Sequence, residues 1–397
     1  MMSMHEQMEQ AEKSILHTYN RFPVMFDRGE GCRLYDTEGK EYLDFAAGIA
    51  VNALGYHYPG YDEALKAQID KLLHISNLYY NEPMSEAGEK LVKASGMSRA
   101  FFTNSGTESI EGALKAARKY SCTKYNGERY EIIAMNHSFH GRSIGALSVT
   151  GTAHYREPFE PLMGGVKFAD FNDLESVKAQ ITDKTCAIIT EVVQGEGGIY
   201  PAKKEFLEGL RQICDEKDIM LIFDEIQCGM GRTGHYFAWQ AYGVQPDIMT
   251  SAKALGCGVP VGAFVLSEKA AKASLEPGDH GTTYGGNPFV CAAVSKVFDI
   301  YKNDKIIEHV QEMTPYLEQK LDEIVAKHEC AATRRGMGFM QGIVIQGRSV
   351  GEVVKAALAK GLLVISAGSD VLRIVPPLVI TKEHIDKMAA ILDECME

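Results

Sequence analysis

Residues 219–227 read IMLIFDEIQ, an apolar run that ends directly on two carboxylates. Apolar runs without polar alternation are typical of strands buried on both faces, as in parallel sheets. Comparable runs occur at 131–135, 186–190, 247–251 and 262–266. The stretch therefore predicts one strand of a mostly parallel central sheet.

Amphipathic segments separate several of these runs. In Lys204–Lys217, apolar residues recur at helical spacing at Phe206, Leu207, Leu210 and Ile213. Strands that alternate with such helices form a parallel sheet with helices on both faces. We therefore predict an α/β fold.

The two ends of the chain follow another pattern. Residues 32–45 read CRLYDTEGKEYLDF, which predicts a hairpin that turns at Glu38-Gly39. The last hundred residues combine long helical stretches with short strands near 338–345 and 371–378. We predict a smaller α+β lobe built from both termini around the α/β domain. The predicted domains are a large one at 51–300 and a small lobe at 1–50 with 301–397.

Composition narrows the classes of function. The chain has 397 residues and 41 Lys+Arg against 53 Asp+Glu, a net charge of −12, and no basic block that would indicate a nucleic-acid partner. The longest uncharged stretch, 45–61, is too short and too polar for a membrane span. Residues 1–13 have no signal or transit pattern, and the nine cysteines include no CxxC pair. We expect a cytoplasmic protein without a disulfide framework, a zinc site or a membrane partner.

Two chemically active residues stand where ligands bind in such sheets, just after strands. Asp224 would emerge at the carboxyl end of its strand, as a magnesium ligand, a structural ion-pair partner or a functional carboxylate. Lys253, in DIMTSAKALG (247–256), is either a surface lysine or a desolvated amine able to form a Schiff base. The two are 253 − 224 = 29 residues apart, about one crossover, so both can face one pocket.

Asn104–Glu108 leads into a predicted helix. Ser105 and Glu108 have the spacing of a capping box, and Gly106 would let a ligand approach the free N–H groups. The segment is either a phosphate cradle or an ordinary capped helix.

Two loops, 136–142 and 280–288, combine glycines with aromatic, hydroxyl and basic side chains. His137 and His140 have no zinc-type spacing, so we expect no metal. A phosphate cradle, a carboxylate, an aromatic face and a lysine are together the parts that pyridoxal 5'-phosphate requires.

At these residues the sequence resembles the class III, ornithine-type aminotransferases. The resemblance covers almost the whole chain, with motifs in the family's order: FAAGIAVNALGY (45–56), SNLYYNEP (76–83), NSGTES (104–109), FHGR (139–142), QGEGGI (194–199), FDEIQCGMGRTG (223–234), TSAKALG (250–256), HGTTYGGNP (280–288) and RGMGFMQG (335–342). It implies a fold-type I pyridoxal phosphate-dependent transferase, a homodimer whose active sites lie between subunits.

The resemblance also implies roles in cofactor binding. Lys253 would carry the cofactor covalently and move the proton in catalysis, Asp224 would pair with the pyridine nitrogen, and Gln227 would approach the ring hydroxyl. The remaining implied cofactor contacts are Ser105, Gly106 and Thr107 on the phosphate, Phe139 on the ring face, and Thr283 on the phosphate from the partner subunit.

Four residues would bind substrate. Arg142 is implied on one substrate carboxylate and Arg373 on a second. Glu196 matches the family's gate residue and is expected to pair with Arg373 in one half-reaction only. Thr282 stands where the family usually has a serine at a substrate contact.

The implied activity is transfer of the δ-amino group of N2-acetyl-L-ornithine to 2-oxoglutarate, in arginine metabolism. Products would be N-acetyl-L-glutamate 5-semialdehyde and L-glutamate. Alternative donors are succinylornithine, succinyldiaminopimelate, ornithine and 4-aminobutyrate. Two alternatives come from other functional classes. The protein could be an aminomutase or racemase, or it could be a binding protein without catalysis.

Overall fold

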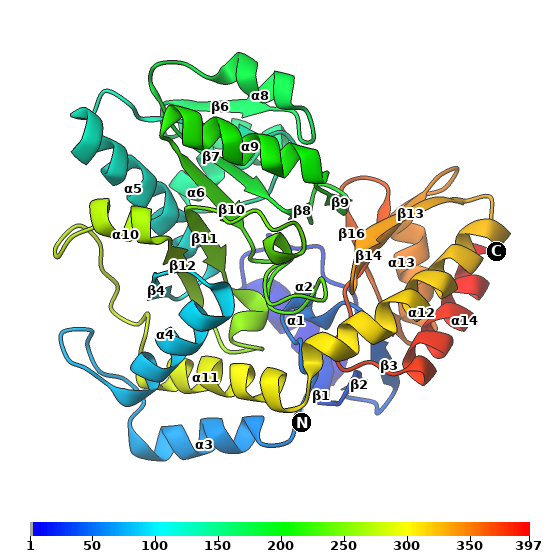
Figure 1. Ribbon diagram of the computed structural model, residues 1–397. Helices are drawn as coiled ribbons and strands as arrows, with labels where there is room; N and C mark the ends of the chain where they lie inside the picture. The colour runs from blue at the N-terminus through cyan, green and yellow to red at the C-terminus, as the bar shows by residue number, and fades with distance from the viewer. Residues whose placement is uncertain (1–2) are drawn as a thin grey trace.

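A computed structural model describes residues 3–397 and is built around a seven-stranded sheet (Figure 1). The strands in spatial order are β4 (Arg99–Thr103), β12 (Gly262–Leu266), β11 (Ile248–Ser251), β10 (Met220–Asp224), β7 (Thr185–Glu191), β5 (Glu131–Met135) and β6 (Val166–Ala169). Every neighbouring pair from β11 to β6 is parallel, which confirms the predicted mostly parallel sheet.

Strand β12 departs from the pattern because it runs antiparallel to both β11 and β4. Parallel neighbours need a long crossover, usually a helix. The link from β11 to β12, 252–261, contains only the 3₁₀ turn η3 (Lys253–Leu255). The chain therefore reverses at this turn.

The sheet is buried on both faces, which explains the unbroken apolar runs. In β5, Ile132 and Ala134 pack in the core on the side of helix α5 (Gly106–Tyr125). Ile133 and Met135 belong to the core on the side of α9 (Lys204–Lys217). Successive side chains of a strand point to opposite faces, so both must be apolar here.

Strands from both ends of the chain share one sheet. The predicted hairpin forms between β2 (Arg33–Asp36) and β3 (Glu41–Asp44), and β15 (Leu362–Leu363) pairs in parallel with β3. The sheet order is β1 (Phe26–Glu30), β2, β3 and β15. Segments from the N-terminal and C-terminal parts of the chain therefore share one sheet, as the predicted small lobe requires.

A second four-stranded sheet carries the C-terminal part (Figure 1, orange to red). Its order is β13 (Ala331–Met337), β14 (Met340–Ile345), β17 (Val371–Ile374) and β16 (Ile365–Ala367). Its surrounding helices are α12 (Ile306–Lys327), α13 (Val350–Ala359) and α14 (Lys382–Met396). The boundary predicted at 300 falls inside α11 (Pro288–Asn303), and the division into two domains stays a prediction.

The remaining elements are short or cover the flanks. They are α1 (Met4–Ser14), α2 (Ala47–Ala50), α3 (Tyr61–Lys71), α4 (Glu82–Ser95), α6 (Ile144–Ser148), α7 (Ala153–Arg156), η1 (Glu157–Phe159), α8 (Leu174–Gln180), β8 (Val193–Gln194), β9 (Tyr200–Pro201), η2 (Ala238–Ala241) and α10 (Glu268–Ala273). Within residues 3–397, no helix combines the length and apolar character needed to span a bilayer.

Candidate active site

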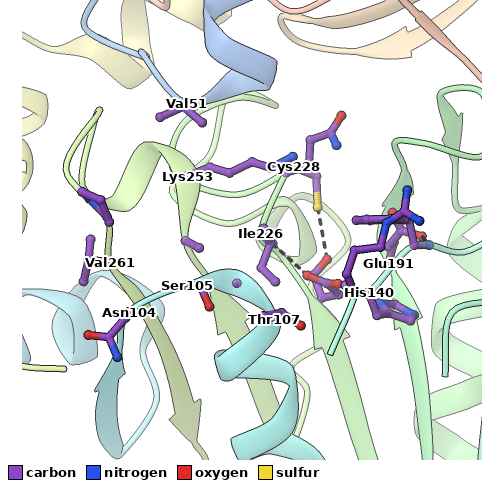
Figure 2. A pocket seen from close by; sticks show the side chains of 18 of the residues that line it. Val51, Asn104, Ser105, Thr107, His140, Glu191, Ile226, Cys228, Lys253 and Val261 are labelled. Carbon is purple, nitrogen blue, oxygen red and sulfur yellow. Dashed lines mark hydrogen bonds and ion pairs between the residues drawn. The ribbon is translucent and has the colours of Figure 1, made fainter. Parts of the chain in front are cut away.

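A cavity of about 500 Å³ opens at the carboxyl ends of the parallel strands (Figure 2). Its wall includes residues that follow β4, β5, β10 and β11, as expected for ligand sites in such sheets. The predicted site residues that line it are Ser105, Gly106, Thr107, Phe139, Arg142, Asp224, Gln227 and Lys253. Glu196, Thr282, Thr283 and Arg373 lie outside this lining.

Lys253 stands two residues after the end of β11 and is half-buried at the cavity wall, opposite the start of α5 (Figure 2). Burial lowers the pKa of its amine to about 8, since desolvation disfavours the ammonium form. The positive charge of Arg373 acts in the same direction, while the carboxylate of Glu196 opposes it. Of the two interpretations of this lysine, the geometry favours the desolvated amine.

Asp224 ends β10 and is almost fully buried. Its Oδ2 lies 2.7 Å from Nδ1 of His140, and its Oδ1 accepts hydrogen bonds from the Thr250 hydroxyl and the Ile226 N–H. Across residues 3–397, no group of three or more His, Cys, Asp or Glu side chains is placed to hold a metal ion. The geometry thus shows Asp224 as the ion-pair partner of His140, at a cavity wall where a functional carboxylate would also stand.

The sequence did not single out His140 as a functional residue. Burial acts to lower the pKa of His140, but the hydrogen bond to Asp224 and the charges of Asp224 and Glu191 outweigh it, so the net shift is upward. The charged imidazole is therefore more favourable here than in a free histidine, and in that form it would stabilise the Asp224 carboxylate at the cavity wall.

Glu191 is a second residue that sequence reasoning missed. It ends β7, stands in register beside Asp224, and lines the cavity near His140 (Figure 2). Its carboxylate accepts the N–H groups of Phe139 at 3.3 Å and Gly195 at 3.1 Å. Burial, with the charge of Asp224, raises its pKa to about 8. The available signal was an apolar run that ends on a carboxylate, as at Asp224.

The start of α5 forms the floor beneath Lys253 (Figure 2). Ser105 caps the helix by accepting the Glu108 N–H, but Glu108 itself accepts the Asn104 N–H at 2.7 Å. The predicted capping box is therefore only half formed. A Cβ at Gly106 would lie 3.0 Å from the Ile226 side chain, so glycine keeps this corner open. The N-terminus of a helix with exposed N–H groups suits a phosphate.

The Phe139 and Arg142 side chains occupy one wall of the cavity. The Arg142 guanidinium carbon lies 5.4 Å from the ring centre of Phe139, and the Arg142 side chain is exposed. A free guanidinium beside an aromatic face can bind a carboxylate through two parallel hydrogen bonds.

Arg373, on β17, is buried and paired with Glu196. Both terminal nitrogens contact the carboxylate, and one also donates to Oε1 of Gln227 at 3.0 Å. Burial acts to raise the pKa of Glu196, but Arg373 outweighs it and holds this pKa below its usual value. The structure thus brings Glu196 and Arg373 together, with Gln227 joined to the same network.

The two threonines of the 280–288 loop do not reach the cavity. Thr282 accepts a hydrogen bond from the Asn104 side chain at 3.2 Å, at the cavity edge. Thr283 is exposed.

Comparisons with known proteins agree with this geometry. The family model described as Aminotransferase class-III matches residues 15–396. An acetylornithine aminotransferase from Caldanaerobacter subterraneus subsp. tengcongensis is 46% identical over 97% of this chain and 98% of its own length. A succinylornithine transaminase from Yersinia pseudotuberculosis is 44% identical over 94% of this chain and 92% of its own length.

Among solved structures, the ornithine aminotransferase from Toxoplasma gondii ME49 superposes with a TM-score of 0.95 at 28% identity. The match covers 100% of this chain and 95% of that one. The chain belongs to the class III aminotransferases, enzymes that use pyridoxal phosphate.

Proposed function

We propose that this enzyme transfers the δ-amino group of N2-acetyl-L-ornithine to 2-oxoglutarate, giving N-acetyl-L-glutamate 5-semialdehyde and L-glutamate. The observation that carries the proposal is the pair of unlike arginines: Arg142 is exposed at the cavity, and Arg373 is masked by Glu196. Acetylornithine has one carboxylate and glutamate has two. One open and one masked arginine suit this pair of donors. The 46% identity to the acetylornithine aminotransferase from Caldanaerobacter subterraneus supports the same substrate.

The residues present fit pyridoxal phosphate. Lys253 would hold it covalently, the Asp224–His140 pair would face its ring nitrogen, and Ser105, Gly106 and Thr107 would hold its phosphate at the start of α5. When bound, the cofactor supplies an electron sink for the reacting carbon. Phe139 would lie against the ring face.

Lys253 has a further role in proton transfer. An amine with a pKa of about 8 can release and accept a proton near neutral pH. We assign Lys253 Nζ the removal of a proton from the substrate carbon that bears the reacting amine. The half-buried position of Lys253 limits competition from water for that proton.

A donor panel tests the substrate. With 2-oxoglutarate as acceptor, we expect acetylornithine to have the highest kcat/KM among acetylornithine, succinylornithine, succinyldiaminopimelate, ornithine and 4-aminobutyrate. A higher value for another donor would reassign the substrate. Turnover without 2-oxoglutarate would instead identify a mutase or racemase.

The Glu196 mask makes a separate prediction. In the native enzyme, a second substrate carboxylate can reach Arg373 only after a charged hydrogen bond to Glu196 breaks, which costs about 1.5–3 kcal/mol. Replacement Glu196→Ala removes this cost. We expect the rate of the glutamate half-reaction relative to the acetylornithine half-reaction to rise about tenfold or more. Glu196→Gln, which keeps a hydrogen-bonding group, should give a smaller rise. Stopped-flow spectra of each half-reaction measure the ratio, and an unchanged ratio would rule out a gate.

We propose a homodimer with shared sites as the working form. In support, Thr283 is exposed outside its own cavity, where it is free to reach a partner's phosphate site. An exposed apolar group also precedes α4, comprising Leu72, Leu73, Leu78, Tyr79 and Tyr80. Sedimentation should give twice the chain mass of 43.7 kDa, and a stable active monomer would contradict the proposal.

We propose that the enzyme works in the cytoplasm and that its substrates are small amino and oxo acids. The free state of all nine cysteines supports a reducing compartment.

A further inference from the structure

Arg142 has no polar partner to hold it in place. Within residues 3–397, its guanidinium makes no hydrogen bond or ion pair. It makes cation–π contacts with two aromatic rings. An unrestrained arginine side chain has many rotamers and loses that freedom when it binds a ligand. Some other feature must hold Arg142 in position for a substrate carboxylate.

Tyr155 is placed to do this. The guanidinium carbon of Arg142 lies 3.8 Å from the Tyr155 ring centre, much closer than its 5.4 Å to Phe139. The Tyr155 ring also meets the Phe139 ring edge to face, at 5.9 Å and 84°. Arg142 therefore rests on Tyr155, and Tyr155 rests against the predicted ring-stacking residue.

The segment that carries Tyr155 contacts the loop after α6 and the edge strand β6. Tyr155 lies on the short helix α7, whose last residue, Arg156, donates to the Thr150 carbonyl at 2.6 Å. Arg156 also lies 4.0 Å from the ring centre of Phe168, on β6. These contacts of Arg156 tie α7 to its surroundings next to Tyr155, although Tyr155 is not itself part of the cavity lining.

The position of Arg142 over the Tyr155 ring also leaves its guanidinium N–H groups free. A guanidinium that lies over a ring directs its N–H groups outward in its own plane, where a carboxylate can take two of them. We propose that Tyr155 is a positioning residue that holds Arg142 for the substrate carboxylate. The proposal rests on the carboxylate-binding role of Arg142 proposed above.

A double-mutant cycle tests this coupling. The probe is glutarate, an unreactive dicarboxylate of the length of glutamate, and its affinity for the holoenzyme is measured by calorimetry. We expect Tyr155→Leu to weaken glutarate binding about 2- to 30-fold, the range of a cation–π contact. In an Arg142→Gln background, Tyr155→Leu should raise the dissociation constant of glutarate by less than about twofold, because the arginine that Tyr155 holds is already absent.

The glutamate half-reaction gives an independent readout. For Tyr155→Leu, we expect the apparent dissociation constant of glutamate to rise by the same factor, with the limiting rate within about threefold of native. Tyr155→Phe keeps the ring, and the Tyr155 hydroxyl makes no hydrogen bond to another residue in 3–397, so this variant should retain native affinity.

The matched control is Tyr35→Leu, which removes a similar ring that lies 4.2 Å from Arg28 in the β1–β2 hairpin. It should leave glutarate affinity unchanged. Additive effects of Tyr155→Leu and Arg142→Gln, or an equal loss in Tyr155→Phe, would overturn the inference. A native enzyme that binds glutarate but does not convert acetylornithine would overturn the proposed function and leave the coupling measurable.

Discussion

Replacement Lys253→Ala should lower kcat at least about 10³-fold, since it removes both the covalent anchor of the cofactor and the group that moves the proton. Residues that line the cavity from other strands remain in place, so noncovalent binding of pyridoxal phosphate should persist. Borohydride reduction should attach the cofactor to the peptide that contains Lys253 in the native enzyme and to no peptide in the variant.

An exposed lysine provides the control for this result. Among residues 3–397, Lys272 on α10 pairs only with Glu268 one turn away, and its side chain is 73% exposed. Lys272→Ala should leave kcat and the reduced adduct unchanged. An adduct on a lysine other than Lys253, or a Lys253→Ala variant with near-native turnover, would contradict the assignment.

Replacement Asp224→Asn should lower kcat/KM about 10²- to 10⁴-fold while the protein stays folded. A loss of this size corresponds to about 3–5 kcal/mol of activation barrier, since each ~1.4 kcal/mol is tenfold in rate. The amide keeps an oxygen for the Thr250 hydroxyl and the Ile226 N–H, but presents no charge to His140 or the cofactor nitrogen. Steady-state kinetics with the preferred donor measure the loss.

Glu225 is the matched control for Asp224. It is the next residue in the chain, is fully buried, and accepts the N–H groups of Ala238 and Trp239 at 2.8 and 2.9 Å. It does not line the cavity. Glu225→Gln should therefore lower stability by about 1–3 kcal/mol and change kcat/KM only a few-fold. Equal kinetic effects in the two variants would mean that Asp224 acts only through the fold.

The strands and their ends were predictable because burial on both faces leaves a strong local signal. Strand β10 pairs with β11 so that Asp224 stands beside Thr250, three residues before Lys253. The short chain separation of Asp224 and Lys253 thus corresponds to neighbouring strand ends, and both line one cavity.

The partners of these residues were not predictable from local pattern. His140 and Asp224 are 84 residues apart in the chain, and Arg373 and Glu196 are 177 apart. Only the resemblance to a family suggested the second pair. Two further features depend on loop conformation, which residue spacing does not determine. They are the antiparallel direction of β12 and the hydrogen bond that the Glu108 carboxylate accepts from the Asn104 N–H.

Transfer of the δ-nitrogen to 2-oxoglutarate is the central claim, and isotope labelling measures it most directly. The native enzyme receives N2-acetyl-L-ornithine that carries ¹⁵N only at the δ-nitrogen, together with unlabelled 2-oxoglutarate, and mass spectrometry follows the products. We predict ¹⁵N-glutamate and N-acetyl-L-glutamate 5-semialdehyde in equal amounts. Unlabelled glutamate, or no glutamate while other amine donors react, would contradict the claim.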